Sequence, residues 1–241
     1  MFSIRSEGYT GKGEALGQEH NMNLSDISVI IPTLNAAAGL PGALAAVAGV
    51  GEVIVVDGGS RDGTVAAAGS ARVVQGARGR GTQFAAGIAA ARHPWLLLLH
   101  ADTRLAPEWR GAALRLMQAG EAKAGYFRLS FDSADPRARR LERVVAWRSR
   151  VFGLPYGDQG LLIHRALLDR AGGMRPLPLM EDVDLARRLG RGRLVALDAT
   201  ALTSPVRYER DGWRRRSLRN LGCLALWFLG VPPRLIAKLY A

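Results

Sequence analysis

Acidic residues stand at three places in the chain where a carboxylate can do chemistry. Asp57 and Asp102 each follow a short apolar run, and Glu181 and Asp182 are adjacent within Met180–Leu185. A carboxylate beyond an apolar run can bind ribose hydroxyls or a divalent cation, because Mg²⁺ takes one or two protein carboxylates together with phosphate oxygens. Two adjacent acids after a glycine-containing loop suit a general base held over a hydroxyl group. The pattern favours an enzyme that acts on a phosphate-bearing ligand.

Each of these acids also has a structural interpretation. Asp57 lies in a glycine-rich turn that can cap a helix. Asp102 can cap the helix expected from Pro107. The helix macrodipole favours negative charge such as that of Glu181 and Asp182 at the start of a helix. The residue types alone leave both interpretations open.

Other polar residues lie between apolar stretches. The glycine-rich stretch Gly76–Gly81 contains Arg78 and Arg80, which can pair with a diphosphate or lie in solvent. His100 can be a ligand, although a single histidine is more often a hydrogen-bonded structural residue. The polar cluster Gly157–Gly160 can line an acceptor site.

An alternation of apolar runs and helix-like stretches positions the first two acids. Buried strands are expected at residues 27–32, 52–56, 72–75 and 95–99, with helices at 41–50, 62–68 and 82–92 between them. Apolar strands separated by helices indicate a mostly parallel sheet covered on both faces. Ligands bind beyond the carboxyl ends of such strands, where Asp57 and Asp102 lie. The sequence therefore predicts an α/β fold with a site at this edge.

The second half of the chain is less regular. Helices are expected at 107–119 and 182–189, and strands at 125–131, 161–164 and 194–197. Residues 137–152 read as an amphipathic helix; its apolar side is expected to hold Leu141, Val144, Val145, Val151 and Phe152. We expect a disordered leader at 1–25, a main domain at 26–210 and an amphipathic helical tail at 211–241. The leader lacks the apolar run of a signal peptide.

Composition excludes several function classes. With 48% hydrophobic residues the chain can bury a core, and its single cysteine, Cys223, excludes an internal disulfide and a multi-cysteine zinc site. Of the net charge of +12, residues 137–150 carry +5 and residues 207–241 carry +6. Neither segment has a nucleic-acid-reading motif, so we expect no nucleic acid partner. A diphosphate, an anionic membrane or plain solvation fits these charges.

The C-terminal residues have the makeup of an interfacial helix. Arg214–Arg216 precede the apolar stretch Leu221–Leu229, and no apolar run reaches the ~20 residues of a membrane-spanning helix. We expect a cytoplasmic protein that binds weakly to the inner face of the cytoplasmic membrane. Docking of this helix on the core and a homodimer interface are the alternatives.

Four segments, taken in order, resemble the family 2 glycosyltransferases with the GT-A fold. Ser28–Asn35 looks like the opening strand and Val55–Thr64 like the nucleotide-binding strand. Leu99–Thr103 stands at the place of the metal-binding Asp-x-Asp, and Met180–Leu185 matches the Glu-Asp catalytic motif. More narrowly, residues 100–103, 156–160 and 203–208 are similar to a bacterial subgroup labelled transferase 2, radical-SAM/selenodomain-associated.

The resemblance implies a nucleotide-diphosphate sugar as donor, an acceptor that is unknown or lipid-linked, and a single inverting displacement. Asp182 would be the general base, supported by Glu181, and Asp102 would hold Mg²⁺ or Mn²⁺. The nucleotide sugar would contact Asp57, Gly58, Arg80, His100, Ala101 and Arg207, and the acceptor would contact Asp158 and Gln159.

The chain departs from the family pattern in two places. His100 replaces the first Asp of the metal motif, which removes a carboxylate from the expected site, and Ala36 stands where Glu is frequent. Two rival functions are a nucleotidyltransferase and a non-catalytic membrane-binding module. The first is disfavoured because the loop Asn35–Pro41 contains no basic residue.

Overall fold

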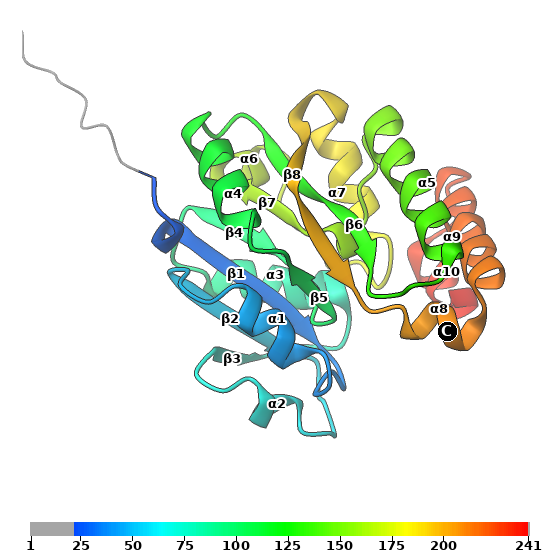
Figure 1. Ribbon diagram of the computed structural model, residues 1–241, viewed down its shortest axis with the longest axis horizontal. Helices are drawn as coiled ribbons and strands as arrows, with labels where there is room; N and C mark the ends of the chain where they lie inside the picture. The colour runs from blue at the N-terminus through cyan, green and yellow to red at the C-terminus, as the bar shows by residue number, and fades with distance from the viewer. Residues whose placement is uncertain (1–21, 241) are drawn as a thin grey trace, which may run out of the picture.

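An eight-stranded sheet with helices on both faces forms the frame of the molecule, for which the computed structural model describes residues 22–240 (Figure 1). The strands are β1 (Ile27–Thr33), β2 (Glu52–Asp57), β3 (Arg72–Gln75), β4 (Trp95–Leu98), β5 (Thr103–Leu105), β6 (Ala124–Phe131), β7 (Leu161–His164) and β8 (Leu194–Thr203). The helices are α1 (Leu40–Ala46), α2 (Thr64–Ala67), α3 (Arg80–Ala90), α4 (Trp109–Gln118), α5 (Pro136–Phe152), α6 (Arg165–Arg170), α7 (Glu181–Leu189), α8 (Val206–Asp211), α9 (Trp213–Phe228) and α10 (Pro233–Tyr240).

The strand order β3-β2-β1-β4-β7-β6-β8-β5 divides the sheet into two parts. Strands β3, β2, β1 and β4 are all parallel, as predicted from their continuous apolar sequences. Beyond them β7 is antiparallel to both β4 and β6, β8 is parallel to β6, and β5 is antiparallel to β8. The predicted α/β fold with a mostly parallel sheet is confirmed.

Both faces of the sheet are covered, which explains why its strands read as apolar runs. Side chains that alternate along β1 belong to different cores. Val29 packs with the face covered by α1 and α4, and Ile30 packs with the face covered by α3, α6 and α7. Every residue of β1 is buried.

A buried glutamine joins helix α3 to the ends of the first two strands. Gln83, which is 3% exposed, donates hydrogen bonds from its amide to the carbonyl oxygens of Thr33 and Val56, each at 2.7 Å. These carbonyls lie where β1 and β2 diverge into loops. The side chain therefore fixes the edge of the sheet at which the sequence predicts the site.

Helix α5 packs through a narrower stripe than its sequence predicts. Ala138, Val145 and Ser149 are its buried residues, whereas Val144 and Phe152, expected on the apolar side, are 58% and 56% exposed. Its buried apolar residues pack on β6 and on Trp213 at the start of α9, and the Ser149 hydroxyl contacts Gln159, so one narrow face is covered.

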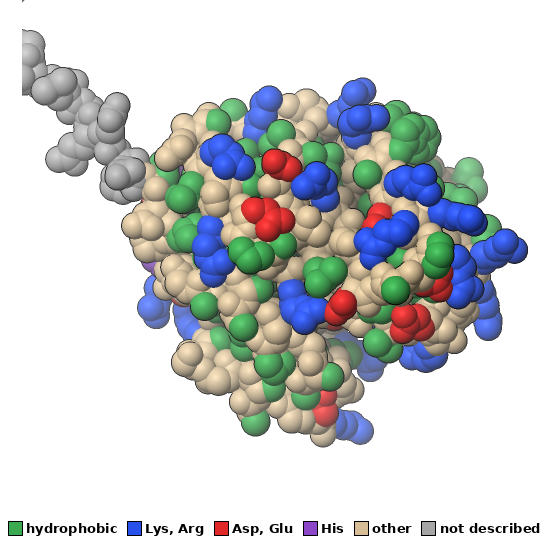
Figure 2. Space-filling view, in the orientation of Figure 1, with side chains coloured by type: hydrophobic (Ala, Val, Ile, Leu, Met, Phe, Trp, Pro, Cys, Tyr) green, Lys and Arg blue, Asp and Glu red, His purple; other side chains and the backbone are tan. Residues whose placement is uncertain are grey.

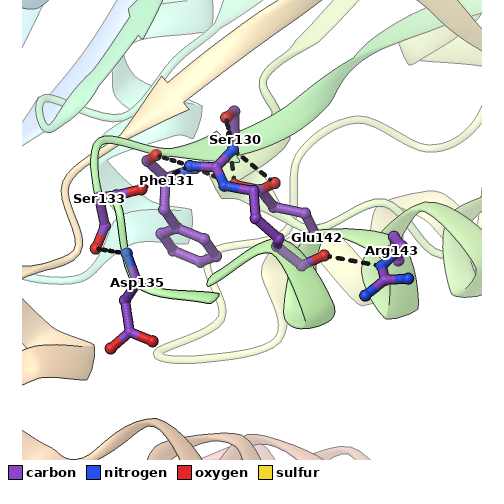
Figure 3. Close-up of polar contacts among 7 residues, drawn as sticks. Ser130, Phe131, Ser133, Asp135, Glu142 and Arg143 are labelled. Atoms are coloured by element: carbon purple, nitrogen blue, oxygen red, sulfur yellow. Dashed lines mark hydrogen bonds and ion pairs between the residues drawn. The ribbon is translucent and has the colours of Figure 1, made fainter. Parts of the chain in front are cut away.

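A glutamate fastens α5 to the sheet. Glu142 accepts hydrogen bonds from the backbone N–H of Phe131 (2.7 Å) and from the Ser130 hydroxyl (3.2 Å) at the end of β6 (Figure 3). This polar contact sets the start of α5 over the end of the strand.

The C-terminal residues form helices α9 and α10, and the inner faces of both pack on the body of the protein. Cys223 and Leu224 of α9 and Ile236 of α10 are buried in one cluster with Met180 and Val183. No helix within residues 22–240 is long and apolar enough to cross a membrane.

The beginning of the chain lies mostly outside the described part. Of the leader expected at 1–25, residues 1–21 are not described, whereas Met22 and Leu24 already pack against the core.

Replacing Gln83 tests how strongly its amide holds the edge of the sheet. Gln83→Met keeps the length of the side chain but leaves two buried carbonyl groups without their donor, so we expect a loss of about 1–3 kcal/mol in the free energy of unfolding. Urea denaturation measures it. Gln118→Met, at the exposed end of α4, is the control and should change stability by less than about 0.5 kcal/mol. Equal effects of the two substitutions would contradict this role.

Candidate active site

The loop after β2 is organised by Asp57. Its carboxylate accepts hydrogen bonds from the backbone N–H groups of Gly59 (3.0 Å) and Ser60 (2.9 Å) and from the hydroxyls of Ser60 and Thr33. Burial by itself raises the pKa of Asp57, but these hydrogen bonds outweigh it and hold the pKa below its usual range.

Asp57 is 2% exposed, and neither it nor the neighbouring Gly58 lines the two cavities described below. The carboxylate thus orders the loop on which a nucleotide can lie. Direct contact of Asp57 and Gly58 with the nucleotide stays a prediction.

The turn after β4 carries His100, Ala101 and Asp102 at the same edge of the sheet. Asp102 lines both cavities, and its carboxylate has no hydrogen bond or ion pair with any residue of the described range. His100 is buried and stacks on Phe84, with ring centroids 6.2 Å apart. Burial and the charge of Arg80 lower the pKa of His100 to about 4, so its ring is neutral at pH 7.

Helix α7 begins at the acidic pair with an unusual backbone conformation. Met180, which precedes it, has a φ of 66°, in the left-handed region that non-glycine residues rarely occupy. Asp182 Oδ2 accepts a hydrogen bond from the backbone N–H of Gly157 (2.8 Å), and Asp182 Oδ1 accepts one from Val183 (2.8 Å). The carboxylate is held in one orientation at the wall of the smaller cavity.

The acids of α7 have separate partners. Glu181, which is 1% exposed, forms an ion pair with Arg80 Nε at 2.9 Å. Burial raises the pKa of the Glu181 carboxyl, and the charge of Arg80 opposes this shift. Asp184 pairs with Arg175 and Arg188 at 3.0 and 2.7 Å and is structural. Of the three acids, Asp182 alone lines the smaller cavity.

The polar cluster before β7 divides between two roles. Gln159 is 1% exposed; its amide donates to the carbonyl oxygen of Phe127 (3.1 Å) and its Oε1 accepts from the Ser149 hydroxyl (2.9 Å). Gln159 lines neither cavity, and its polar atoms are used inside the fold; its contact with the acceptor stays a prediction. Asp158 does line the smaller cavity.

The site consists of two cavities that meet at Asp102. The larger one runs over the ends of β1 and β4 and is lined by the loop after β1 and by Arg78. The smaller one lies between Asp182 and the C-terminal helices. Arg80, His100 and Arg207 line both. The fold thus brings most of the predicted site residues, which come from distant segments, to the two cavities. Four of them line neither cavity: Asp57, Gly58, Gln159 and Glu181.

Several residues of the smaller cavity carry no sequence signal of their own. Tyr156, Tyr208, Arg216, Asn220 and Tyr240 line it together with Asp182. The first two lie inside segments 156–160 and 203–208, which resemble the bacterial subgroup, but that resemblance assigns these two tyrosines no role. The other three are hidden in the basic and apolar pattern of the C-terminal helices.

The site can accept a hard divalent cation only with help from a ligand. The described residues contain no group of three or more His, Cys, Asp or Glu side chains that could hold a metal ion. Asp102 nevertheless offers an unpartnered carboxylate between the cavities, and Mg²⁺ or Mn²⁺ commonly takes one or two protein carboxylates with substrate phosphates and water. The donor set fits a metal that arrives with a diphosphate.

Comparison with known proteins identifies the sequence family. The model of glycosyl transferase family 2 matches residues 28–177, well over half of the chain. A search of curated proteins by sequence finds no match.

Solved structures share the fold at low sequence identity. TarS of S. aureus, residues 1–349, is 18% identical with a TM-score of 0.58; the match covers 76% of this chain and 61% of the TarS fragment. Glucosyl-3-phosphoglycerate synthase of Mycobacterium tuberculosis, in complex with Mn²⁺, uridine diphosphate and glucosyl-3-phosphoglycerate, is 21% identical with a TM-score of 0.50, covering 74% of this chain and 70% of that one. The chain thus spans less than two thirds of the TarS fragment.

The pKa of Asp158 predicts a pH-dependent stability. Burial, opposed by Arg148 and reinforced by Asp182, raises this pKa from 3.8 to about 6. A raised carboxyl pKa makes the folded state lose stability as the pH rises from about 4 through about 6. Without divalent cations, Asp158→Asn should therefore be more stable than the wild type by about 1–3 kcal/mol at pH 8, with no gain at pH 4.

Denaturant unfolding at both pH values measures this difference. Asp198→Asn is the control, because the Asp198 side chain is 82% exposed and should show no such pH-dependent gain. A gain for Asp158→Asn that is as large at pH 4 as at pH 8 would contradict the assignment.

Proposed function

The chain belongs to glycosyl transferase family 2, and from this premise we propose that it moves a sugar from a nucleotide-diphosphate donor to an acceptor hydroxyl, with Asp182 as general base. One observation carries the assignment of the base. The Asp182 carboxylate lines the smaller cavity and is oriented there by the N–H groups of Gly157 and Val183. The bound acceptor would lie in that cavity.

We propose that the donor occupies the larger cavity. The same edge of the parallel strands binds ligands in other open α/β sheets, and Arg78, Arg80 and Arg207 line this cavity with charges that can pair with a diphosphate. A uridine donor is supported by the related structures, since TarS and the synthase were crystallised with UDP-GlcNAc and UDP-glucose, respectively. Asp102 would hold Mg²⁺ or Mn²⁺, which neutralises charge on the leaving diphosphate.

The geometry fits a single displacement. Asp182 removes the proton of the acceptor hydroxyl, the acceptor oxygen bonds to the anomeric carbon, and the bond from that carbon to the diphosphate oxygen breaks. Attack from the smaller cavity, opposite the diphosphate, inverts the anomeric configuration. Glu181 supports the base through its ion pair with Arg80, which fixes the start of α7.

Two further questions concern the subgroup to which the chain belongs and the rival nucleotidyltransferase function. Residues 100–103, 156–160 and 203–208 support placement in the bacterial subgroup labelled transferase 2, radical-SAM/selenodomain-associated. The family match weakens the nucleotidyltransferase alternative.

A second candidate function is attachment to an anionic membrane, which would give access to a lipid-linked acceptor. Apart from Val65, the exposed large hydrophobic side chains lie at residues 144–152 of α5 or 206–239 of the C-terminal helices. Basic side chains gather over the same helices (Figure 2). On α9, Leu218 and Leu221 are 68% and 61% exposed next to Arg214 and Arg215. Apolar side chains among cations are typical of interfacial helices.

Asp182→Asn tests the general base. The amide cannot take the acceptor proton, so we expect kcat to fall by about 10²–10⁴-fold, while the affinity for the donor nucleotide changes less than about threefold. Coupled release of nucleoside diphosphate measures the rate, and calorimetric titration measures nucleotide binding. Asp169→Asn on the exposed side of α6 is the control. Undiminished transfer by Asp182→Asn would refute the assignment.

Vesicle binding tests the membrane surface. We expect co-sedimentation with vesicles of phosphatidylglycerol and phosphatidylcholine, weaker at high salt, and absent with phosphatidylcholine alone. Replacing Leu218 and Leu221 together by Ser should weaken binding by about tenfold or more, because each leucine inserts apolar area. Val65→Ser, at an exposed apolar residue of α2, should bind like the wild type. Equal losses in both variants would exclude this surface.

A further inference from the structure

The C-terminal helices form one wall of the cavity that contains Asp182. Tyr208 comes from α8, Arg216 and Asn220 from α9, and Tyr240 from α10. All four lie beyond residues 28–177, the part of the chain that the family model matches. The wall therefore lies outside the matched part of the chain and is a place where acceptor specificity can arise.

Four buried polar atoms around this cavity have no hydrogen-bond partner within the described structure. They are His100 Nε2, Asp158 Oδ1, Arg216 Nε and Asn220 Oδ1. Leaving such a group unsatisfied costs about 1–3 kcal/mol, and most buried polar groups in proteins have a partner. Their convergence on one cavity indicates a ligand, with ordered water, that supplies the missing hydrogen bonds.

The donor or acceptor character of these atoms indicates which groups the ligand carries. Asp158 Oδ1 and Asn220 Oδ1 accept hydrogen bonds, and Arg216 Nε donates one. A molecule that meets both kinds of group within one small cavity carries several hydroxyls, since a hydroxyl donates and accepts. A simple aliphatic alcohol would satisfy one of these groups and leave the rest without a partner.

The remaining walls are aromatic. Tyr156, Tyr208 and Tyr240 line the cavity. Arg148, Trp213 and Arg219 lie over these rings in that order, so each ring has at most one face left for a ligand beside its polar hydroxyl. A pyranose ring has the matching surface, with C–H groups on its faces and hydroxyls around its edge. Aromatic walls and hydrogen-bonding groups of both kinds together fit a saccharide.

The charges of the cavity do not require an anionic acceptor group. The guanidinium of Arg216, which is 5% exposed, pairs with Asp211 Oδ2 at 2.8 Å, a carboxylate that it shares with Arg210 and Arg219, and donates to the Tyr240 hydroxyl at 2.9 Å. Asp102, Asp158 and Asp182 line the same cavity together with Arg80, Arg207 and Arg216, so its acidic and basic side chains are equal in number. A neutral, hydroxyl-rich group leaves this balance unchanged.

We propose that the acceptor group bound in this cavity is itself a saccharide, and that Asn220 and Arg216 are specificity-determining residues for it. This inference rests on the proposed glycosyl transfer. A hydroxyl of the acceptor sugar gives its proton to Asp182, its oxygen bonds to the anomeric carbon of the donor, and nucleoside diphosphate leaves. The product is a glycosidic linkage between two sugars.

A panel of small acceptors tests the substrate class. The full chain is incubated with UDP-glucose or UDP-GlcNAc, Mn²⁺ and methyl glucoside, methyl galactoside or methyl mannoside, with propanol and glycerol 3-phosphate as comparison acceptors. We expect a disaccharide product, detected by mass spectrometry, from at least one methyl glycoside and none from propanol. Product from propanol or glycerol 3-phosphate but from no glycoside would overturn the inference.

Variants of α9 locate the specificity. Asn220→Ala should raise KM for the accepted glycoside by about tenfold and leave KM for the donor and its acceptor-free hydrolysis unchanged. Ala225→Ser, at an exposed residue of α9 that does not line the cavity, is the control. Unchanged glycoside KM in Asn220→Ala would overturn the role of Asn220.

Donor hydrolysis and transfer to a glycoside are measured separately, so they distinguish failure of the proposed glycosyl transfer from failure of the saccharide inference. If neither nucleotide sugar binds or is hydrolysed, the proposed glycosyl transfer from a uridine donor fails. If a donor binds and is hydrolysed but no glycoside accepts the sugar, the saccharide inference alone fails.

Discussion

The ion pair between Arg80 and Glu181 is the contact on which the arrangement of the site depends. Arg80 is the first residue of α3 and Glu181 the first of α7, so the pair joins two helix starts that are a hundred residues apart in sequence. Glu181 is 1% exposed, whereas the Arg80 side chain is 35% exposed, so removing Arg80 would leave a buried carboxylate without its charge partner. Because the start of α7 is fixed, the position of the next residue, Asp182, is fixed as well, and Asp182 lines the cavity.

This constraint works because α3 is itself fixed to the sheet. Gln83, one turn beyond Arg80, bonds to the ends of β1 and β2. The strand ends thus determine where α3 begins, α3 determines where α7 begins, and α7 carries the proposed general base. Polar groups that look like candidates for chemistry, such as Asp57 and Gln159, are used instead to hold the loops beside this frame.

The C-terminal helices have two surfaces with different roles. Their inner face closes the cavity beside Asp182 and carries buried polar atoms of Arg216 and Asn220 that have no hydrogen-bond partner within residues 22–240. Their outer face exposes leucines among cations. One pair of helices can therefore contact the acceptor and the surface that carries it, which would couple where the protein lies to what it modifies.

Much of the fold was predictable, because strands buried on both faces must be apolar throughout and helices must separate parallel strands. Strands β3 and β7 have the predicted bounds. Short elements such as β5 and α6 were missed, since three to six residues carry too little pattern. On α5 the sequence gives the helix but not its neighbours, so Val144 and Phe152 were expected inside and lie outside.

The sequence by itself determined the α/β fold, the family, and the position of Asp102 and Asp182 at element ends, because these follow from local patterns and motifs. Only the tertiary structure decided which polar groups remain available. Gln159 and Asp184 have all their partners inside the protein, whereas Asp102 has none, and residues from α9 and α10 meet Asp182 across the cavity. Whether a polar atom is satisfied depends on neighbours that are distant in the chain, and no local pattern records them.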